Sequence, residues 1–345
     1  MSDSYPVSVI ITTFNEGEYL DRLLRDLAEQ DCSGLDVEIV LLEAGNYPVS
    51  RAREQLGARA ESLVFLQAPG MPRTLALNTM VEHAHGSLII RLDARSHIAP
   101  DYLRRITDLS RATNAENVGG VQSPIGLSES QQLIAEVMKC PLSLGGARFR
   151  KAAYEGCGES VYLGAFNVSK IHFRKWFDEQ HPLISEDSDL NHRIRQAGGT
   201  IYIDSSIVVE HYPREDLLRF FRLCYNYGVG RGLFVIKNRK FSALRQVAPP
   251  IALFSVLLMG MGGFAIPALH WALTSTIALY VLVLSVAALR ITRKPSAVVK
   301  VICALAGCHL FWTVGLVLSP VQYRRDCAIT ERKSEAEFVV LSRDR

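Results

Sequence analysis

The sequence predicts an α/β domain with a mainly parallel sheet, followed by a C-terminal helical region that enters a membrane. Two observations lead to this prediction. In the first hundred or so residues, short β-branched runs alternate with stretches of helical periodicity, a spacing typical of parallel sheets. In the last third, three apolar stretches of about 20 residues follow one another, each long enough to cross a bilayer.

Strands and helices alternate from the N-terminus onward. Residues 7–12 are a β-branched run of the buried-strand type, and Leu20, Leu23, Leu24 and Leu27 are spaced to keep one face of a helix apolar. The same criteria predict further strands at 37–42, 63–67 and 87–92 and further helices at 49–59 and 74–84.

Polar residues follow three of these strands, at 12–16, 43–46 and 93–97. Ligands of open parallel sheets bind beyond the carboxyl ends of the strands. We therefore expect a nucleotide to bind at this edge.

The stretch 118–203 is less regular and rich in glycine, and we expect loops on the acceptor side with one or two strands. A helix is predicted at 182–197, with Ser185 as its N-cap and acidic residues in its first turn. A strand at 201–210 follows, and the basic amphipathic pattern of 216–227 suits a helix lying on a membrane surface.

The three apolar stretches are 247–267, 269–289 and 298–320. Basic residues before the first and after the second place both flanks in the cytoplasm by the positive-inside rule. The third has His309 near its middle, so a re-entrant or interfacial segment is the alternative to the full crossing that we favour.

Composition narrows the functional classes. A net charge of +3 over 345 residues does not indicate nucleic-acid binding. The 7 cysteines are scattered, which fits reduced thiols better than disulfides or zinc. The N-terminus has no apolar core of the length that a secretory signal needs, so we expect the first part of the chain to be cytosolic.

These observations divide the chain into four regions. We expect a cytosolic domain at 1–213, an interfacial helix with a basic linker at 214–246, a membrane region of two or three transmembrane helices at 247–320, and a polar tail at 321–345. The oligomeric state cannot be inferred from the sequence.

Three motifs in order carry a family resemblance: the run from Pro6 to Glu16, Leu92-Asp93-Ala94-Arg95, and Ser185-Glu186-Asp187. With them the chain resembles a family 2 glycosyltransferase of GT-A fold, a Rossmann-like mixed, mainly parallel sheet flanked by helices. Further motifs resemble the membrane-bound succinoglycan-type exopolysaccharide glycosyltransferases, and they lie at 128–134, 145–150, 161–166 and 227–231.

The resemblance implies an inverting transfer in which Asp187 is the base that takes the proton of the acceptor hydroxyl. Glu186 would orient Asp187 or the acceptor. From the residues alone, the alternative is that both acids only complement the N-terminus of their helix.

Asp93 resembles the first acid of the family's Asp-x-Asp motif, and would contact the ribose or a Mg²⁺ or Mn²⁺ ion on the diphosphate. Arg95 replaces the second acid, and a guanidinium has no lone pair for a metal. Either His97 or His211 completes the coordination, or Arg95 supplies part of the cation's charge. We favour a metal held by Asp93 and His211; a surface or acceptor-loop histidine is the alternative for His211.

Glu43 stands where the family has an aspartate that hydrogen-bonds uracil, and its alternative is a plain loop acid. Arg231 would neutralise the leaving diphosphate, or is only a basic flank of the membrane region. The other residues expected to bind the nucleotide sugar are Thr12, Thr13, Phe14, Asn15, Glu16, Arg73 and Asn78.

The function predicted is a multi-pass inner-membrane glycosyltransferase with a cytoplasmic catalytic domain. It would transfer a sugar from a nucleotide sugar, UDP-linked, to a polyprenyl-linked glycan among membrane lipids in polysaccharide or glycoconjugate assembly. A polyprenyl-phosphate monosaccharide synthase is an alternative, although that group usually has an acid where Arg95 stands. A non-catalytic membrane subunit is another, supported by Glu43 and Arg95 and opposed by Asp93 and Glu186-Asp187.

Overall fold

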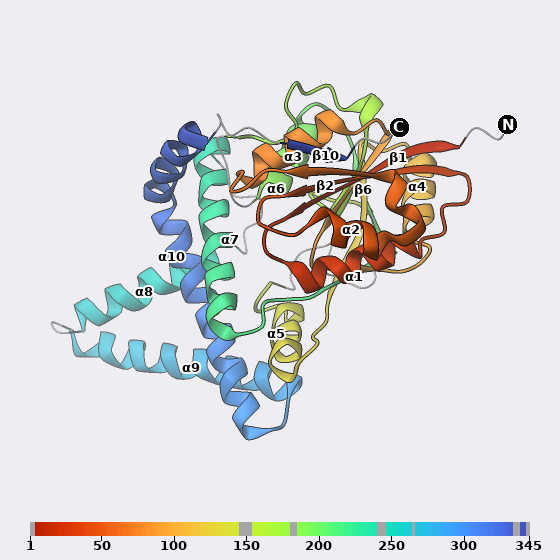
Figure 1. Ribbon diagram of the computed structural model, residues 1–345. Helices are drawn as coiled ribbons and strands as arrows, with labels where there is room; N and C mark the ends of the chain where they lie inside the picture. Colours follow the sequence, from red (N-terminus) through yellow and green to blue (C-terminus); the bar gives the residue numbers. More distant parts are fainter. Residues whose placement is uncertain are drawn as a thin grey trace. The chain divides into compact units, whose positions relative to one another are not determined.

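The computed structural model describes residues 4–144, 154–179, 185–239, 246–263, 266–333 and 339–342. It divides into two compact units (Figure 1). The sheet unit comprises 1–124, 147–212 and 325–345, and the helical unit comprises 125–146 and 213–324. The predicted motif at 145–150 and the start of the predicted helix at 182–184 lie outside the described residues.

The sheet unit contains a mixed sheet with the strand order β10-β3-β2-β1-β4-β8-β6-β9-β5, and β7 pairs with β9. Strands β3, β2, β1 and β4 are mutually parallel, as are β6 and β9, while β8, β5, β7 and β10 pair antiparallel to their neighbours. The strands are β1 (Tyr5–Thr13), β2 (Leu35–Glu43), β3 (Leu63–Gln67), β4 (Leu88–Asp93), β5 (Ser96–Ile98), β6 (Asn117–Pro124), β7 (Glu155–Cys157), β8 (Tyr162–Asn167), β9 (Ile201–His211) and β10 (Val339–Ser342).

The helices of this unit are α1 (Gly17–Ala28), α2 (Val49–Leu56), α3 (Arg73–His83), α4 (Tyr102–Thr113) and α6 (Glu186–Gln196), with short 3-10 turns at Gly57–Ser62 and Val168–Lys170. The fold class and every predicted strand are confirmed. The helix α4 was not predicted, and the tail predicted to be polar contains β10, because Val339-Val340-Leu341 is a β-forming run.

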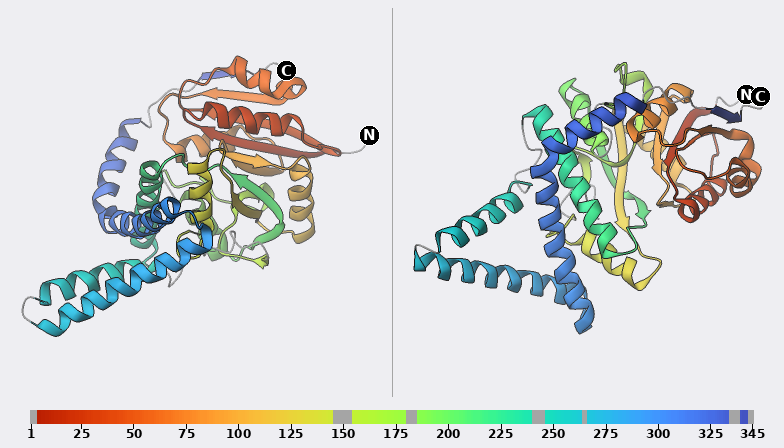
Figure 2. Two further views of the ribbon diagram at one scale, coloured as in Figure 1. Left: turned by 90° about the horizontal axis from the view of Figure 1, so that it is seen from below. Right: turned by 60° about the vertical axis from the view of Figure 1, so that its left-hand side comes forward.

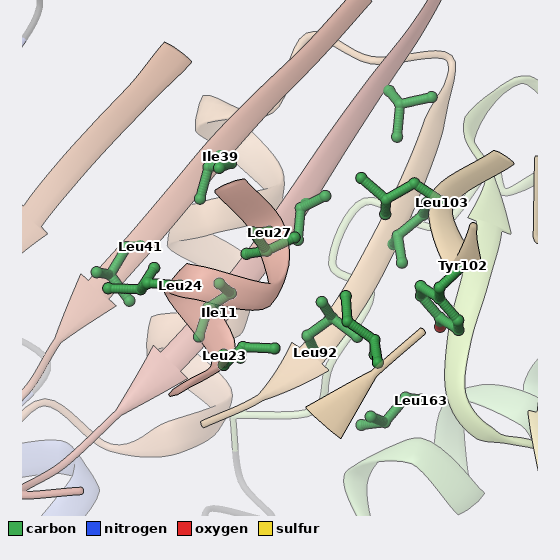
Figure 3. Close-up of a cluster of buried hydrophobic side chains, with 14 of the residues drawn as sticks. Ile11, Leu23, Leu24, Leu27, Ile39, Leu41, Leu92, Tyr102, Leu103 and Leu163 are labelled. Atoms are coloured by element: carbon green, nitrogen blue, oxygen red, sulfur yellow. The ribbon is translucent and has the colours of Figure 1, made fainter. Parts of the chain in front are cut away.

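Both faces of the sheet are covered by helices, since strand side chains alternate between its faces. On one face Ile11 and Ile39 contact Leu23, Leu24 and Leu27 of α1 in a buried cluster (Figure 3). On the other face a second cluster includes residues of α3 and α6, among them Ile10, Val40, Leu77, Met80, Leu190 and Ile194. A sheet fixed from both sides is a rigid base for the loops at its edge.

The helical unit contains α5 (Glu129–Lys139), α7 (Leu217–Asn238), α8 (Ala248–Gly262), α9 (Pro267–Ile291) and most of α10 (Pro295–Lys333). The helix α5 falls in the stretch predicted to be loops and strands. Its start follows from an N-cap that the sequence contains, because Ser128 Oγ accepts a hydrogen bond from the amide of Gln131.

By length and composition, two of the described helices can cross a membrane, α9 and the Pro295–Gln322 part of α10. The first apolar stretch forms α8, whose 15 residues extend about 22 Å, less than the roughly 30 Å of a hydrocarbon core. The third stretch is one continuous helix, with Pro320 inside it. Large apolar side chains of α8 and α9 are exposed, including Phe254, Leu258, Trp271 and Leu282.

The predicted surface helix at 216–227 continues to Asn238 as α7, and it packs along α10 (Figure 2). Glycines allow the close approach. A Cβ atom on Gly228 would lie 2.0 Å from the carbonyl oxygen of Trp312, and one on Gly315 would lie 2.1 Å from that of Tyr225. Part of the apolar surface of α7 is therefore covered by protein, with Phe220 and Cys224 in a buried cluster with α5, α9 and α10.

Candidate active site

Three parallel strands end together and bring the predicted nucleotide residues to one edge. Thr12 of β1 is in register with Asp93 of β4, and Thr13 is in register with Glu43 of β2. Phe14 follows β1 and is 61% exposed. The sheet topology thus groups these residues as expected.

Two acids and two arginines form an ion cluster around the C-terminal end of β4. Arg73 donates through Nη2 to Asp93 Oδ1 at 2.7 Å and through Nε to Glu186 Oε1 at 3.0 Å. Arg91 donates through Nη2 to Glu186 Oε1 at 2.7 Å, and the same nitrogen lies 3.5 Å from Asp93 Oδ1. The cluster joins β4 with the first residues of α3 and α6, and its formal charges balance.

These contacts hold both acids ionised. Burial alone would raise the pKa of Asp93, but the charges of Arg73, Arg91 and His211 outweigh it and lower that pKa to about 2. The pKa of Glu186 is also lowered, since Arg91 and Arg73 outweigh the effect of its burial. The lowered pKa values favour the carboxylate forms of Asp93 and Glu186 at neutral pH.

The lowered pKa of Asp93 predicts an acid-sensitive contribution to stability. A depressed pKa stabilises the fold above the ordinary value of 3.8, and the contribution is lost as the pH falls towards about 2. We expect the thermal unfolding midpoint of the wild type to fall more steeply over this interval than that of Asp93→Asn. Parallel curves, measured by tryptophan fluorescence, would contradict the assignment.

The charge of Asp187 acts on the same cluster. Burial disfavours the charged form of Arg91, but the carboxylates of Glu186 and Asp93, and to a smaller extent Asp187, raise the pKa of Arg91. Asp187 Oδ1 accepts a hydrogen bond from the amide of Ser188 at 2.7 Å. The side chain is thus held at the N-terminus of α6, close enough to Arg91 for its charge to be felt.

Arg95 lies in an ion pair. Its Nε donates to Glu16 Oε2 at 2.7 Å, and its guanidinium lies 4.0 Å from the ring centroid of Tyr19. Arg95, which stands at the position of the second acid of the motif, is buried, and these two contacts stabilise its charge inside the protein. The carboxylate of Glu16, expected to bind the donor, is used in the same pair.

Glu43 is fully buried at the end of β2, where burial raises the pKa of its carboxyl. Its Oε1 accepts a hydrogen bond from the amide of Gly45 at 2.6 Å. A Cβ at position 45 would lie 2.4 Å from Asn15 Oδ1 and 2.5 Å from Glu43 Oε1, so any larger residue there would displace these two side chains. Asn15 has a positive φ of 54°. The nearness of its side chain to position 45 shows that the loops after β1 and β2 lie against each other.

The side chain of Asn78 makes hydrogen bonds within the protein. Its Oδ1 accepts from the amide of Phe177 at 2.9 Å, and its Nδ2 donates to the carbonyl of Phe177 at 2.8 Å and to Glu179 Oε1 at 3.0 Å. The residue is buried, and these bonds attach the segment before α6 to α3.

We expect Asn78→Ala to destabilise the fold by about 1–3 kcal/mol, because the backbone polar groups of Phe177 would be left unpaired. Thermal unfolding measures this, and Glu82→Ala, at an exposed position of the same helix, should have little effect. Weakened nucleotide binding with an unchanged melting temperature would instead restore Asn78 to the donor site.

The two candidate metal-binding histidines, His97 and His211, have different surroundings. His97 pairs with Asp26 Oδ2 at 2.7 Å. His211 lies opposite Ser96 in the pairing of β5 with β9, and its Nδ1 is 3.1 Å from Tyr162 Oη. Since the charge of His211 contributes to the lowered pKa of Asp93, His211 is the histidine near the ion cluster.

Arg231 belongs to the helical unit, where its guanidinium lies 5.2 Å from the ring centroid of Phe234. Sequence reasoning missed Arg91 altogether. The available signal was a positive charge inside the apolar run Leu88–Asp93, because a buried arginine requires a partner.

Comparison with known proteins extends these observations. Residues 8–166 match the model of the family described as Glycosyl transferase family 2. The chain is 25% identical over 327 residues to the succinoglycan biosynthesis protein ExoA of Rhizobium meliloti (strain 1021), covering 93% of this chain and 96% of that protein.

A second relative is the dolichyl N-acetyl-alpha-D-glucosaminyl phosphate 3-beta-D-2,3-diacetamido-2,3-dideoxy-beta-D-glucuronosyltransferase of Methanococcus voltae. It is 22% identical over 240 residues, which cover 67% of this chain and 74% of that protein.

Among solved structures, the mannosyltransferase PcManGT from Pyrobaculum calidifontis, in complex with GDP-Man and Mn²⁺, aligns with a TM-score of 0.52. The two chains are 19% identical, and the alignment covers 95% of this chain and 87% of that one. This likeness confirms the predicted fold class. Together with the family match and the relatives, it shows that the chain carries a family 2 glycosyltransferase domain of GT-A fold.

Proposed function

We propose that the protein is a membrane-anchored, inverting glycosyltransferase. It transfers a sugar from a nucleotide sugar, UDP-linked, to a lipid-linked glycan in extracellular polysaccharide or glycoconjugate assembly. The observation that carries the proposal is the ion cluster, in which Asp93 at the nucleotide edge and Glu186-Asp187 at the start of α6 share the charges of Arg73 and Arg91.

The chemistry follows from these groups. Asp187 takes the proton of the acceptor hydroxyl while the hydroxyl oxygen attacks the anomeric carbon. The bond from that carbon to the diphosphate breaks, and the nucleoside diphosphate leaves with the electron pair. A single displacement inverts the anomeric centre. Arg73, whose side chain is 35% exposed, supplies positive charge to the departing diphosphate.

A divalent cation fits this site on the chemistry of the available groups. Asp93 is ionised, and His211 is near it. Among the described residues, no three His, Cys, Asp or Glu side chains are placed so that they could hold a metal ion together, so the donor's phosphates and water would complete the shell. That arrangement is usual for Mg²⁺, and PcManGT was solved with Mn²⁺. Mg²⁺ or Mn²⁺ would neutralise diphosphate charge when bound.

Membrane anchoring by α9 and α10 is supported by their length and apolar composition. A lipid-linked acceptor is supported by the relative named for a dolichyl-linked acceptor, and polysaccharide assembly is supported by the relative named for succinoglycan biosynthesis. We place the catalytic domain, 1–213, at the cytoplasmic face of the inner membrane, where basic flanks of the apolar helices would also lie.

The proposal is tested with the purified protein in detergent and a lipid extract from its host. UDP- and GDP-sugars are screened for release of the nucleoside diphosphate, and lipid products are analysed by mass spectrometry. We expect release from a UDP-sugar and a new sugar–sugar linkage on a lipid carrier. A sugar–phosphate product would favour the monosaccharide synthase, and no release with any donor would favour a non-catalytic subunit.

The same assay tests the cation. EDTA should abolish most of the release, and added Mg²⁺ or Mn²⁺ should restore it. Unchanged activity in EDTA would remove the cation from the proposal while leaving the glycosyl transfer intact.

A further inference from the structure

Arg91 carries a positive charge into the middle of a buried strand. Its side chain is 6% exposed, and the apolar residues on both sides of it in β4 are fully buried. A charge taken out of water is costly unless it is paired and hydrogen-bonded. Packing within the strand does not explain an arginine at this buried position.

Its hydrogen-bond partner Glu186 is the first residue of α6, the helix that carries the proposed base. Arg91 Nη2 contacts Glu186 Oε1 at 2.7 Å, 95 residues along the chain, and the guanidinium lies 5.9 Å from the ring centroid of Phe177. Arg91 thus reaches from the centre of the sheet to the first residue of α6.

The N-cap residue of α6 gives the helix no side-chain cap. Ser185, predicted as its N-cap, has a positive φ of 81° and its side chain makes no capping hydrogen bond. Ser185 thus occupies the predicted N-cap position but does not cap the helix with its side chain, and its backbone is in the left-handed conformation. The side chain that anchors this turn is that of Glu186, and Asp187 is the next residue.

The two arginines differ in what they can reach. The side chain of Arg73 is 35% exposed, so it can contact a substrate, whereas that of Arg91 is 6% exposed. Both donate to the same oxygen of Glu186. If Arg73 turns towards the diphosphate, Arg91 alone keeps Glu186 in place.

We propose that Arg91 is a positioning residue, which holds Glu186 and thereby the first turn of α6 so that Asp187 faces the acceptor while Arg73 contacts the donor. This proposal rests on the proposed function, because it assumes that Asp187 is the base. It assigns Glu186 a role in orienting Asp187 and none in binding the acceptor.

The test compares Arg91→Met, Arg91→Lys and the control Ile90→Val, which alters the same strand at a fully buried position without removing the contact to Glu186. We expect Arg91→Met to lower kcat by about tenfold or more with donor KM changed less than about twofold, the pattern of a lost transition-state interaction. Arg91→Lys should recover part of kcat, since it keeps the charge. Ile90→Val should lower the melting temperature and leave kcat unchanged.

Two readouts separate misfolding from mispositioning. UDP or GDP affinity, measured by calorimetry, should be retained in Arg91→Met if the donor site is intact. The double variant Arg91→Met/Glu186→Gln removes both buried charges, and should regain melting temperature without regaining kcat.

A wild-type rate in Arg91→Met, or a kcat that recovers with melting temperature in the double variant, would overturn the positioning role. Absence of turnover in the wild type with every donor would instead overturn the proposed function.

Discussion

Replacing Asp187 with asparagine is expected to lower kcat by about 10²–10⁴-fold, the range that general bases contribute. The amide is nearly the same size and its oxygen can still accept the hydrogen bond from Ser188, but it cannot take a proton. Donor KM should change little, because the removed interaction belongs to the acceptor's proton transfer. Initial rates of nucleoside diphosphate release measure both constants.

The matched control is Asp189→Asn in the same turn of α6. Asp189 is buried and accepts a hydrogen bond from Arg193 Nε at 3.0 Å, so its change should lower the melting temperature and leave kcat nearly unchanged at a temperature where the variant is folded. Equal losses of kcat in the two variants would mean that α6 responds only as a structural element, and Asp187 would lose its assignment.

The second large effect is expected at Gly228. A leucine there would place its Cβ 2.0 Å from the carbonyl oxygen of Trp312 and 2.9 Å from the amide of Leu316, so α7 and α10 would have to separate. Inserting bulk into a packed contact costs about 1–3 kcal/mol, and backbone neighbours that cannot rotate away place this site at the upper end. We expect poor recovery of monodisperse protein in detergent and a clearly lowered melting temperature.

Gly260→Leu is the control for this change. Gly260 lies in α8, where the nearest atom to an added Cβ is Leu273 Cδ2 at 4.0 Å. The variant should behave as the wild type in size-exclusion chromatography and thermal unfolding. The same loss in both variants would show that added bulk in any apolar helix is harmful, and the α7–α10 contact would not be special.

The strands, and the edge at which they end, could be predicted because the sequence patterns that define them are local. Alternating β-branched runs and helical periodicity define the elements, and a parallel topology then places Thr12, Glu43 and Asp93 at one edge. The family resemblance singled out Glu186-Asp187 as candidate catalytic residues, whereas residue types alone would leave them as acids at a helix N-terminus.

The partners of the individual site residues could not be predicted, since these contacts join segments that are far apart in the sequence. Arg95 meets Glu16 at a separation of 79 residues, and Asn78 meets Phe177 at 99. No local pattern distinguishes these structural partners from ligand-binding residues. Likewise, the low helix propensity of glycine disfavours a helix that continues through Gly228. Close packing against α10 outweighs this preference.

The pairing of β10 with β3 has a practical meaning for anyone who isolates the sheet unit. A fragment that stops at 213 lacks the C-terminal strand, and β3 would then present a row of unpaired amides and carbonyls. Such an open border recruits other chains, so aggregation of a truncated soluble form would reflect the missing cover and not a defect of the remaining fold.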